Sequence, residues 1–411
     1  MNTSNISGLR RCVGVTVVIL FTLLPQTMEN ANSSPAKVAA NAQVAQIAAA
    51  NTQFGFNLLH QLNDDSKNDN VFFSPFSVTQ ALSLTLNGAG DPTDKEISHA
   101  LGLRSLTLDE VNHGNALLLP SITNPDPKVQ LSVANALWAN KGEKFSSAFQ
   151  GRCDKYYKAT VATLDFQSPS GANTINNWVK NKTHDKIDKI VSQEDIEGSP
   201  AVLTNALYFH GQWTKQFEKR RTQDGPFNLA DGTSKTVPFM SRSGTFAYSE
   251  TPTFQAVSLP YGSGRLSMYI VLPKAGTTIG DVVDKLDSNT WQDDITQMHP
   301  TEVGIALPRF KASYSTLMND QLSALGMGPA FGSGANFTPM GLPGVFIGKV
   351  IHKAVLDVNE EGTVAAAATA VIMTRSIRLT PQMRVDHPFF CAIRDNETGT
   401  ILFMGVIRDP Q

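Results

Sequence analysis

Helical patterns lie mainly in the first part of this chain, and strand patterns lie mainly in the last part. Apolar residues recur at helical spacing over residues 36–62, and a second helix is predicted after the turn Ser74–Ser77, through Leu86. Strands are predicted at residues 71–73, 130–140, 203–209, 256–259 and 265–273 and within 389–406, and further helices around 175–190 and 317–325. Because strands and helices do not alternate along the chain, we expect a mixed α+β domain.

No Pro/Ser/Gly-rich linker, charge run or internal repeat divides the 411 residues, so one large folding unit is expected after the N-terminal segment. The formal net charge of −2 gives no electrostatic reason to expect a nucleic acid or an anionic membrane as a partner.

The first residues are typical of a secretory signal peptide. Arg10 and Arg11 precede an apolar run from Cys12 to Leu24, and the small residue Ala31 follows. As a helix this run would cover only ~20 Å, too little to span a bilayer. We therefore expect a signal peptide at 1–31, an extension and the start of the first helix at 32–49, and the folded domain at 50–411. The protein should be secreted, or periplasmic in a bacterium.

Two cysteines remain after such a leader, Cys153 and Cys391, and neither has metal-ligand spacing to another cysteine or histidine. A disulfide between them stays open, but buried free thiols are the preferred interpretation.

Motifs that would indicate an enzyme are missing. The sequence has no G-x-S-x-G elbow, no H-E-x-x-H pair and no P-loop, and Gly326–Gly332 misses the dinucleotide fingerprint by one residue. A triad assembled only in space stays open, because triads are defined by geometry. We expect no catalytic residues, no metal and no cofactor.

One segment stands out by composition. After Glu360-Glu361-Gly362, the twelve residues Thr363–Thr374 (TVAAAATAVIMT) contain no charge, proline or glycine. A buried Ala-rich helix is one interpretation. However, the second half is β-branched, which suits a strand, and the segment runs into Arg375 without a helix cap, as an exposed loop does.

This segment resembles the hinge of inhibitory serpins, in which an acidic residue is followed by glycine, Thr or Ser, and small residues. The resemblance extends over about residues 50–411. It includes NVFFSPFS at 70–77, LTNALYFHGQWTKQFE at 203–218, His352-Lys353-Ala354, and HPFFCAIRDNETGTILFMGVIRDP at 387–410.

The resemblance implies a serpin fold: a single large domain with three β-sheets, about nine helices and an exposed reactive-centre loop at about 360–385. It implies an inhibitor of serine proteases that is cleaved in this loop and traps the acyl-enzyme by inserting the loop into the main sheet. The implied hinge residues are Glu360, Gly362, Thr363, Ala365, Ala366, Ala367 and Ala368. The implied residues beneath the sheet opening are Ser74, Ser77, Asn205 and His352, with Trp213 as a gate; an ordinary satisfied core cluster is the alternative.

The residue chemistry fits insertion. Side chains alternate along a strand, so Thr363, Ala365, Ala367, Thr369, Val371 and Met373 would share one uncharged face. The usual glutamate after the hinge threonine is replaced by Val364, which falls on the opposite face.

Two ways of counting give different reactive bonds. The resemblance implies that the residue before the cleaved bond lies sixteen positions beyond the hinge acid Glu360, which is Ser376, with Ile377 after the bond. However, the stretch TPQMRVDHPF resembles serpins whose cleaved arginine lies six positions before the proline, and from Pro381 this count gives Arg375. A trypsin-like pocket binds arginine through a charge-assisted contact that serine cannot make, so we expect the bond Arg375–Ser376. Ser376–Ile377 ranks second and Arg378–Leu379 third.

The expected partner is therefore a trypsin-like serine protease, bound covalently by a monomeric inhibitor. Lys and Arg are sparse between residues 104 and 130, so binding of a glycosaminoglycan is not supported. A non-inhibitory serpin, acting as a carrier or chaperone, is the alternative, and a hydrolase is the least favoured.

Overall fold

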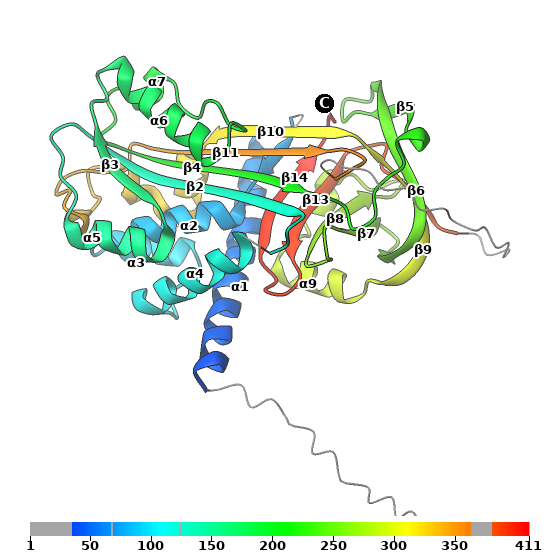
Figure 1. Cartoon of the computed structure of the whole chain (residues 1–411), viewed down its shortest axis with the longest axis horizontal. Coiled ribbons are helices and arrows are strands. Elements are labelled where there is room, and N and C mark those ends of the chain that lie inside the picture. Colours follow the sequence, from blue (N-terminus) through cyan, green and yellow to red (C-terminus); the bar gives the residue numbers. More distant parts are fainter. Residues whose placement is uncertain (1–34, 67–68, 124, 363–379, 411) are drawn as a thin grey trace, which may run out of the picture.

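Ten α-helices and fourteen β-strands are formed by the residues that the computed structural model describes, which are 35–66, 69–123, 125–362 and 380–410 (Figure 1). The helices are α1 (Pro35–Asp65), α2 (Pro75–Leu86), α3 (Thr93–Ala100), α4 (Leu108–Thr123), α5 (Ser147–Arg152), α6 (Pro169–Lys182), α7 (Gln193–Ile196), α8 (Ile279–Val283), α9 (Ser288–Thr296) and α10 (Asn319–Leu322). The short turns are the π-helices η1 (Cys153–Tyr157) and η3 (Ser323–Met327) and the 3₁₀-helices η2 (Lys219–Arg221), η4 (Gly328–Phe331) and η5 (Thr338–Met340). The strands are β1 (Val71–Phe73), β2 (Val129–Asn140), β3 (Thr160–Leu164), β4 (Ala201–Gly211), β5 (Gln223–Asn228), β6 (Ser234–Glu250), β7 (Phe254–Pro260), β8 (Leu266–Pro273), β9 (His299–Pro308), β10 (Phe310–Leu317), β11 (Lys349–Val358), β12 (Gln382–Arg384), β13 (Phe389–Asp395) and β14 (Ile401–Ile407).

The smaller sheet has the strand order β10-β11-β4-β2-β3 and a parallel pair at its centre (Figure 1). β4 and β11 run in parallel, with Val202 opposite Lys349 and Tyr208 opposite Val355. β2 pairs antiparallel with β4, and β10 pairs antiparallel with β11. Every second residue of β11 from Val350 to Val358 is buried, so one face of this strand lies against the main core.

The larger sheet has the order β1-β14-β13-β8-β7-β6-β9-β12, with β5 paired to β6. The expectation of three sheets is wrong for the described strands, whose hydrogen bonds form two sheets. The physical reason is the long strand β6, which pairs with β5 at residues 234–239, with β9 at residues 239–248 and with β7 at residues 247–250. It thereby joins strands that would otherwise form separate sheets. The α+β class holds.

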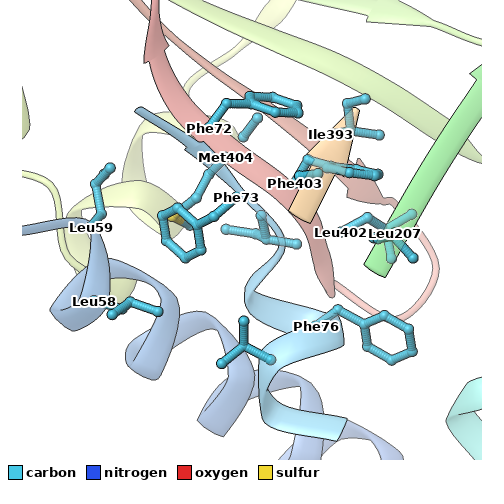
Figure 2. Close-up of a cluster of buried hydrophobic side chains, with 14 of the residues drawn as sticks. Leu58, Leu59, Phe72, Phe73, Phe76, Leu207, Ile393, Leu402, Phe403 and Met404 are labelled. Atoms are coloured by element: carbon cyan, nitrogen blue, oxygen red, sulfur yellow. The ribbon is translucent and has the colours of Figure 1, made fainter. Parts of the chain in front are cut away.

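The main core lies where α1 and α2 pack against the hairpin β13–β14 and strand β1. Figure 2 shows aromatic and aliphatic side chains from these elements meeting Leu207 of β4. Phe72 stacks on Phe403 with ring centroids 5.4 Å apart. The side-chain oxygen of Ser74 caps α2 by accepting from the Ser77 N–H, and the whole of α2 is buried behind the five-stranded sheet.

A second, smaller core covers the other face of that sheet. Ile175 and Val179 of α6 pack with Ile187 and Ile190 against side chains of β2 and β4. This explains one wrong boundary. We predicted a helix to about residue 190, but α6 ends at Lys182, and the following loop continues the apolar pattern because it packs on the same surface.

Most other elements predicted from the sequence are confirmed, including α1, α2, the antiparallel pair β7–β8 and the closing hairpin β13–β14. The helix predicted at 317–325 is shifted: β10 continues to Leu317, α10 covers Asn319–Leu322, and the turn η3 that follows is π-helical. The predicted signal peptide at 1–31 lies outside the described residues. No helix in the described ranges is long and apolar enough to cross a membrane.

Cys153 and Cys391 are buried free thiols, as the sequence favoured. Burial raises the pKa of each thiol to about 12, so both stay protonated at neutral pH.

Candidate functional site

The segment between β11 and β12 leads from the smaller sheet to the larger one, since β11 is a central strand of the first and β12 an edge strand of the second. Its residues 363–379 lie outside the described residues. They include the predicted hinge positions Thr363, Ala365, Ala366, Ala367 and Ala368 and the predicted bond residues Arg375, Ser376, Ile377, Arg378 and Leu379. The residues at the two ends of the segment, Gly362 and Thr380, and the two sheets that contain β11 and β12 are described.

The chain reverses direction immediately after β11. Asn359 and Gly362 form an antiparallel bridge, and the Gly362 N–H donates to the Asn359 carbonyl at 3.1 Å. Gly362 has φ +82°, and a Cβ there would lie 2.3 Å from the Trp213 nitrogen and 2.5 Å from the Gly211 oxygen. Only glycine fits both the left-handed backbone and the close approach.

Trp213 fixes this turn through hydrogen bonds and ring contacts. Its indole Nε1–H donates to the Asn359 carbonyl at 2.8 Å, and its backbone N–H donates to the Glu361 carbonyl at 3.2 Å. The indole stacks on Tyr261 at 4.2 Å between centroids and meets Phe217 edge-on. The tryptophan therefore ties the end of β4 to the turn that ends β11.

Glu360, one of the predicted hinge positions, anchors the turn. Its side chain is only 2% exposed, and Arg309 Nε donates to both carboxylate oxygens at 2.8 Å. Thr222 donates its hydroxyl to the same carboxylate. Burial opposes ionisation of Glu360, but the hydrogen bonds from Arg309 and Thr222 outweigh it and hold the pKa below its ordinary value.

A buried polar network lies between β4 and β11, in the middle of the sheet. Asn205 and His352 are opposite each other in register, and His352 Nε2 accepts from the Ser74 backbone N–H at 3.1 Å. Since Nε2 is an acceptor, the proton of the neutral ring is on Nδ1, which donates to the Asn205 amide oxygen. Burial lowers the pKa of His352 to about 3, so the ring is neutral at physiological pH.

The network continues to β2 and α2. Asn205 Nδ2 donates to the Ser77 carbonyl at 2.8 Å and to the side-chain oxygen of Asn135, which is opposite Asn205 in the β2–β4 register. The only side-chain hydrogen bond described between β4 and β11 in this network is the one from His352 to Asn205. Separating these two strands therefore breaks one buried side-chain bond and leaves Asn205 bonded to β2 and α2.

The structure brings Ser74, Ser77, Asn205 and His352 together as one cluster, with Trp213, Glu360 and Gly362 at the end of the same strand pair. Sequence reasoning missed Asn135, Arg309 and Thr222. No local signal marks them, because their partners are 51 to 138 residues away. Among the described residues, no group of three or more His, Cys, Asp or Glu side chains could hold a metal ion.

Comparison with known proteins gives one consistent result. The family model Serpin (serine protease inhibitor) matches residues 49–410. Human Serpin B11 is 34% identical over 393 residues, covering 89% of this chain and 100% of that protein. The leukocyte elastase inhibitor of Sus scrofa is 35% identical over 381 residues, covering 89% of this chain and 100% of that protein. The solved structure of human thyroxine-binding globulin has a TM-score of 0.83 at 27% identity, covering 90% of this chain and 100% of that one.

Proposed function

The chain belongs to the serpin family, and on this premise we propose that it inhibits a trypsin-like serine protease by inserting its cleaved loop between β4 and β11. The family contains relatives named as protease inhibitors and also the thyroxine-binding globulin. Membership of the family therefore does not distinguish inhibition from transport, and the proposal rests on the arrangement of β4, β11 and the turn after β11.

The observation that carries the proposal is the parallel pair β4–β11 followed by a reversed chain. Because the turn at Asn359–Gly362 reverses the direction of the chain, a strand continuing from it runs antiparallel to β11. It also runs antiparallel to β4, since β4 and β11 are parallel. Insertion would replace one parallel ladder with two antiparallel ladders, which are somewhat more stable per residue.

The register of the turn also supports the proposal. If the bridge Asn359–Gly362 continues as a ladder, Thr363 comes opposite Val358, Ala365 opposite Leu356 and Ala367 opposite Ala354. Directly opposite residues share a face, and these three β11 side chains are buried. The uncharged face of the segment would therefore be the face that enters the core.

The next pair in this register is Thr369 opposite His352. Insertion would break the bond between His352 and Asn205 and leave a buried ring N–H to be satisfied. The hydroxyl of Thr369 would be a hydrogen-bond partner at that level. A chain with a large apolar residue at 369 would leave the imidazole unpaired.

The free energy that insertion would release is large enough to move a covalently bound protease. About ten new ladder hydrogen bonds at ~1 kcal/mol each give a driving force on the order of 10 kcal/mol, before apolar burial is added. Small side chains at Ala365–Ala368 let the strand enter without overpacking.

The covalent step belongs to the protease. Its serine oxygen attacks the Arg375 carbonyl carbon, the bond to the Ser376 nitrogen breaks, and this nitrogen takes up a proton and becomes the free N-terminus of residues 376–411. Arg375 stays esterified to the enzyme while the preceding segment inserts. Arginine at this position selects a protease with an acidic specificity pocket.

We further propose that residues 1–31 direct secretion, so that the target is an extracellular or periplasmic protease, and that the inhibitor is monomeric. The signal proposal rests on the arginine pair and apolar run at 10–24.

Incubation with trypsin, followed by denaturing electrophoresis, tests the proposed function. We expect a covalent band at the summed mass of inhibitor and enzyme that survives boiling in detergent. Arg375→Ala should lose this band with trypsin, while Arg384→Ala, close to the other end of the segment, should keep it. Cleavage of the wild-type chain without any stable complex would favour a carrier instead.

A further inference from the structure

β12 is the first described strand after residues 363–379, and it is short. It pairs in parallel with β9 over three residues, 382–384. Figure 1 shows β9 with β5 and β6 at the end of the molecule opposite α3 and α5. The bond that we expect to be cleaved, Arg375–Ser376, lies closer along the chain to β12 than to the turn at Gly362. How firmly β12 is held therefore determines how precisely the C-terminal side of this bond is positioned.

The pairing of β12 with β9 is extended by one hydrogen bond at each end. The Gly304 N–H donates to the Pro381 carbonyl at 2.9 Å, and the Val385 N–H donates to the Ala306 carbonyl at 2.8 Å. Beyond this ladder the chain turns and enters β13 at Phe389. Because a parallel ladder this short contributes only a few bonds, the contacts of the turn have a large share in holding the strand.

His387 in this turn contacts two acceptors. Its Nδ1 is 2.9 Å from Oδ1 of Asp386, and its Nε2 is 2.9 Å from the carbonyl oxygen of Pro273 at the end of β8. A carboxylate and a backbone carbonyl accept hydrogen bonds and do not donate them. A neutral imidazole has one N–H and can satisfy only one of the two, whereas the charged ring donates to both. The geometry therefore fits the doubly protonated ring.

The charged side chains beside the ring come from β12, from β6 and from the end of β8. Arg384 Nε lies 3.5 Å from Oδ2 of Asp386, the carboxylate oxygen that His387 does not contact. Lys274, the residue after β8, is paired with Glu250 of β6 at 2.5 Å. Arginine and lysine side chains keep their charge between pH 5 and 8, where histidine changes its own. His387 is therefore the cation of this group whose hydrogen bonding changes in that range.

The turn also contacts two further strands. The Asn228 N–H of β5 donates to the Asp386 carbonyl at 2.7 Å, and the Arg384 guanidinium lies over the Phe239 ring of β6, 4.0 Å from its centroid. His387 adds the contact with β8. Protonation of the ring therefore strengthens the attachment of this turn to the larger sheet, while the contacts with β5 and β6 stay the same.

We propose that His387 is a positioning residue, whose charged form holds β12 in place and thereby orients the bond Arg375–Ser376 for attack by the protease. This inference rests on the proposed function, because it concerns the reaction at that bond. A bond held near its reactive orientation is attacked faster, since less freedom is lost when the protease docks. Complex formation is therefore faster with the charged ring than with the neutral ring.

The second-order rate constant of complex formation with trypsin, measured at pH 6 and pH 8, tests the positioning. The rate of each variant is divided by the wild-type rate at the same pH, so that the pH dependence of trypsin itself cancels. His387→Gln should be about fivefold slower than the wild type at pH 6 and within about twofold of it at pH 8. The effect is modest because the side chains of His387 and Asp386 are 34% and 31% exposed.

Two further variants separate the charge of the ring from its shape. His387→Arg has a permanent charge and several donors, so it should match the wild type at pH 6 and exceed it at pH 8. His99→Gln, at an exposed position of α3, should match the wild type at both pH values. If the ratio of His387→Gln to the wild type is the same at pH 6 and pH 8, the charged ring does not position the bond.

Hydrogen exchange of residues 382–385, measured without protease, tests separately whether the ring holds β12. Protection factors, corrected for the intrinsic exchange rate at each pH, should be higher at pH 6 than at pH 8 in the wild type. They should be equal at the two pH values in His387→Gln and in His387→Arg. Protection that does not depend on pH in the wild type would overturn the role of the ring. If no complex with trypsin forms at any pH, the proposed function and the positioning both fail, and pH-dependent protection would still support the attachment of β12 by His387.

Discussion

His352 of β11 and Asn205 of β4 lie opposite each other in register, and the neutral imidazole donates its Nδ1–H to the asparagine oxygen. The other ring nitrogen accepts from the Ser74 N–H at the start of α2. One buried ring therefore connects β4 and β11 to the helix behind them, at the level where the proposed insertion would add a strand.

The stability of the protein should depend on pH through His352. Its pKa in the folded protein is about 3, against an ordinary value of 6.5, because burial disfavours the charged ring. The unfolded chain binds the proton more tightly, so this contribution to stability is present above pH 6.5 and is lost as pH falls toward 3. Between about pH 6 and 4 the free energy of unfolding should fall by up to about 1.4 kcal/mol per pH unit from this ring.

Urea unfolding of the wild type and His352→Gln at several pH values in this window measures the effect. The free energy of unfolding should change less steeply with pH in His352→Gln than in the wild type. His299→Gln, at an exposed position, controls for the loss of an imidazole. If the free energy of unfolding depends on pH equally in the wild type and in His352→Gln, the pH dependence does not come from His352.

Arg309→Met should destabilise the protein by about 2–3 kcal/mol, because it leaves the buried Glu360 carboxylate without its main partner. Adding Glu360→Gln in the same chain should recover part of this loss, which a double-mutant cycle measures. The neighbouring exposed pair Lys311–Asp357, 3.4 Å apart, is the control, and Lys311→Met should cost less than about 1 kcal/mol. Equal costs for the two variants would argue against the anchor.

Thr363→Arg should turn the inhibitor into a substrate. An unpaired guanidinium on the face that enters the core costs several kcal/mol and slows the first step of insertion. Val364→Arg, one position further on the opposite face, is the matched control and should keep most of the complex formation. The ratio of complex to cleaved product on a denaturing gel measures both. If the two variants behave alike, the register proposed for insertion is wrong.

Cleavage in the loop should raise the thermal midpoint. A gain of about 10 kcal/mol corresponds to an increase on the order of 10–15 °C for a domain of this size. Calorimetry of intact and nicked protein makes the measurement, and Thr363→Arg in nicked form should gain less. A nicked wild type that melts within a few degrees of the intact protein would support the carrier function.

The reactive bond can be located by mass spectrometry of the C-terminal fragment released from the denatured complex. An N-terminus at Ser376 is expected, because arginine fills an acidic pocket and serine does not. Ile377 or Leu379 at that N-terminus, together with trypsin inhibition by Arg375→Ala, would move the bond to one of the two alternatives.

The sequence by itself determined the features that depend on neighbouring residues. The cap and proline that start α2, the turn between β13 and β14, and the uncharged segment after Gly362 all follow from local patterns. Local patterns set these elements because caps, turns and alternating faces need only a few adjacent residues. The resemblance to serpins rests on the same short stretches, taken in order.

Only the tertiary structure decided how distant residues meet. Asn205 and His352 are 147 positions apart, and no spacing rule predicts that they are in register on parallel strands. The anchor Arg309–Glu360 and the end of α6 at Lys182 likewise come from packing between distant elements. Strand register and non-local polar contacts are fixed by burial in the assembled core, which a single stretch of sequence does not contain.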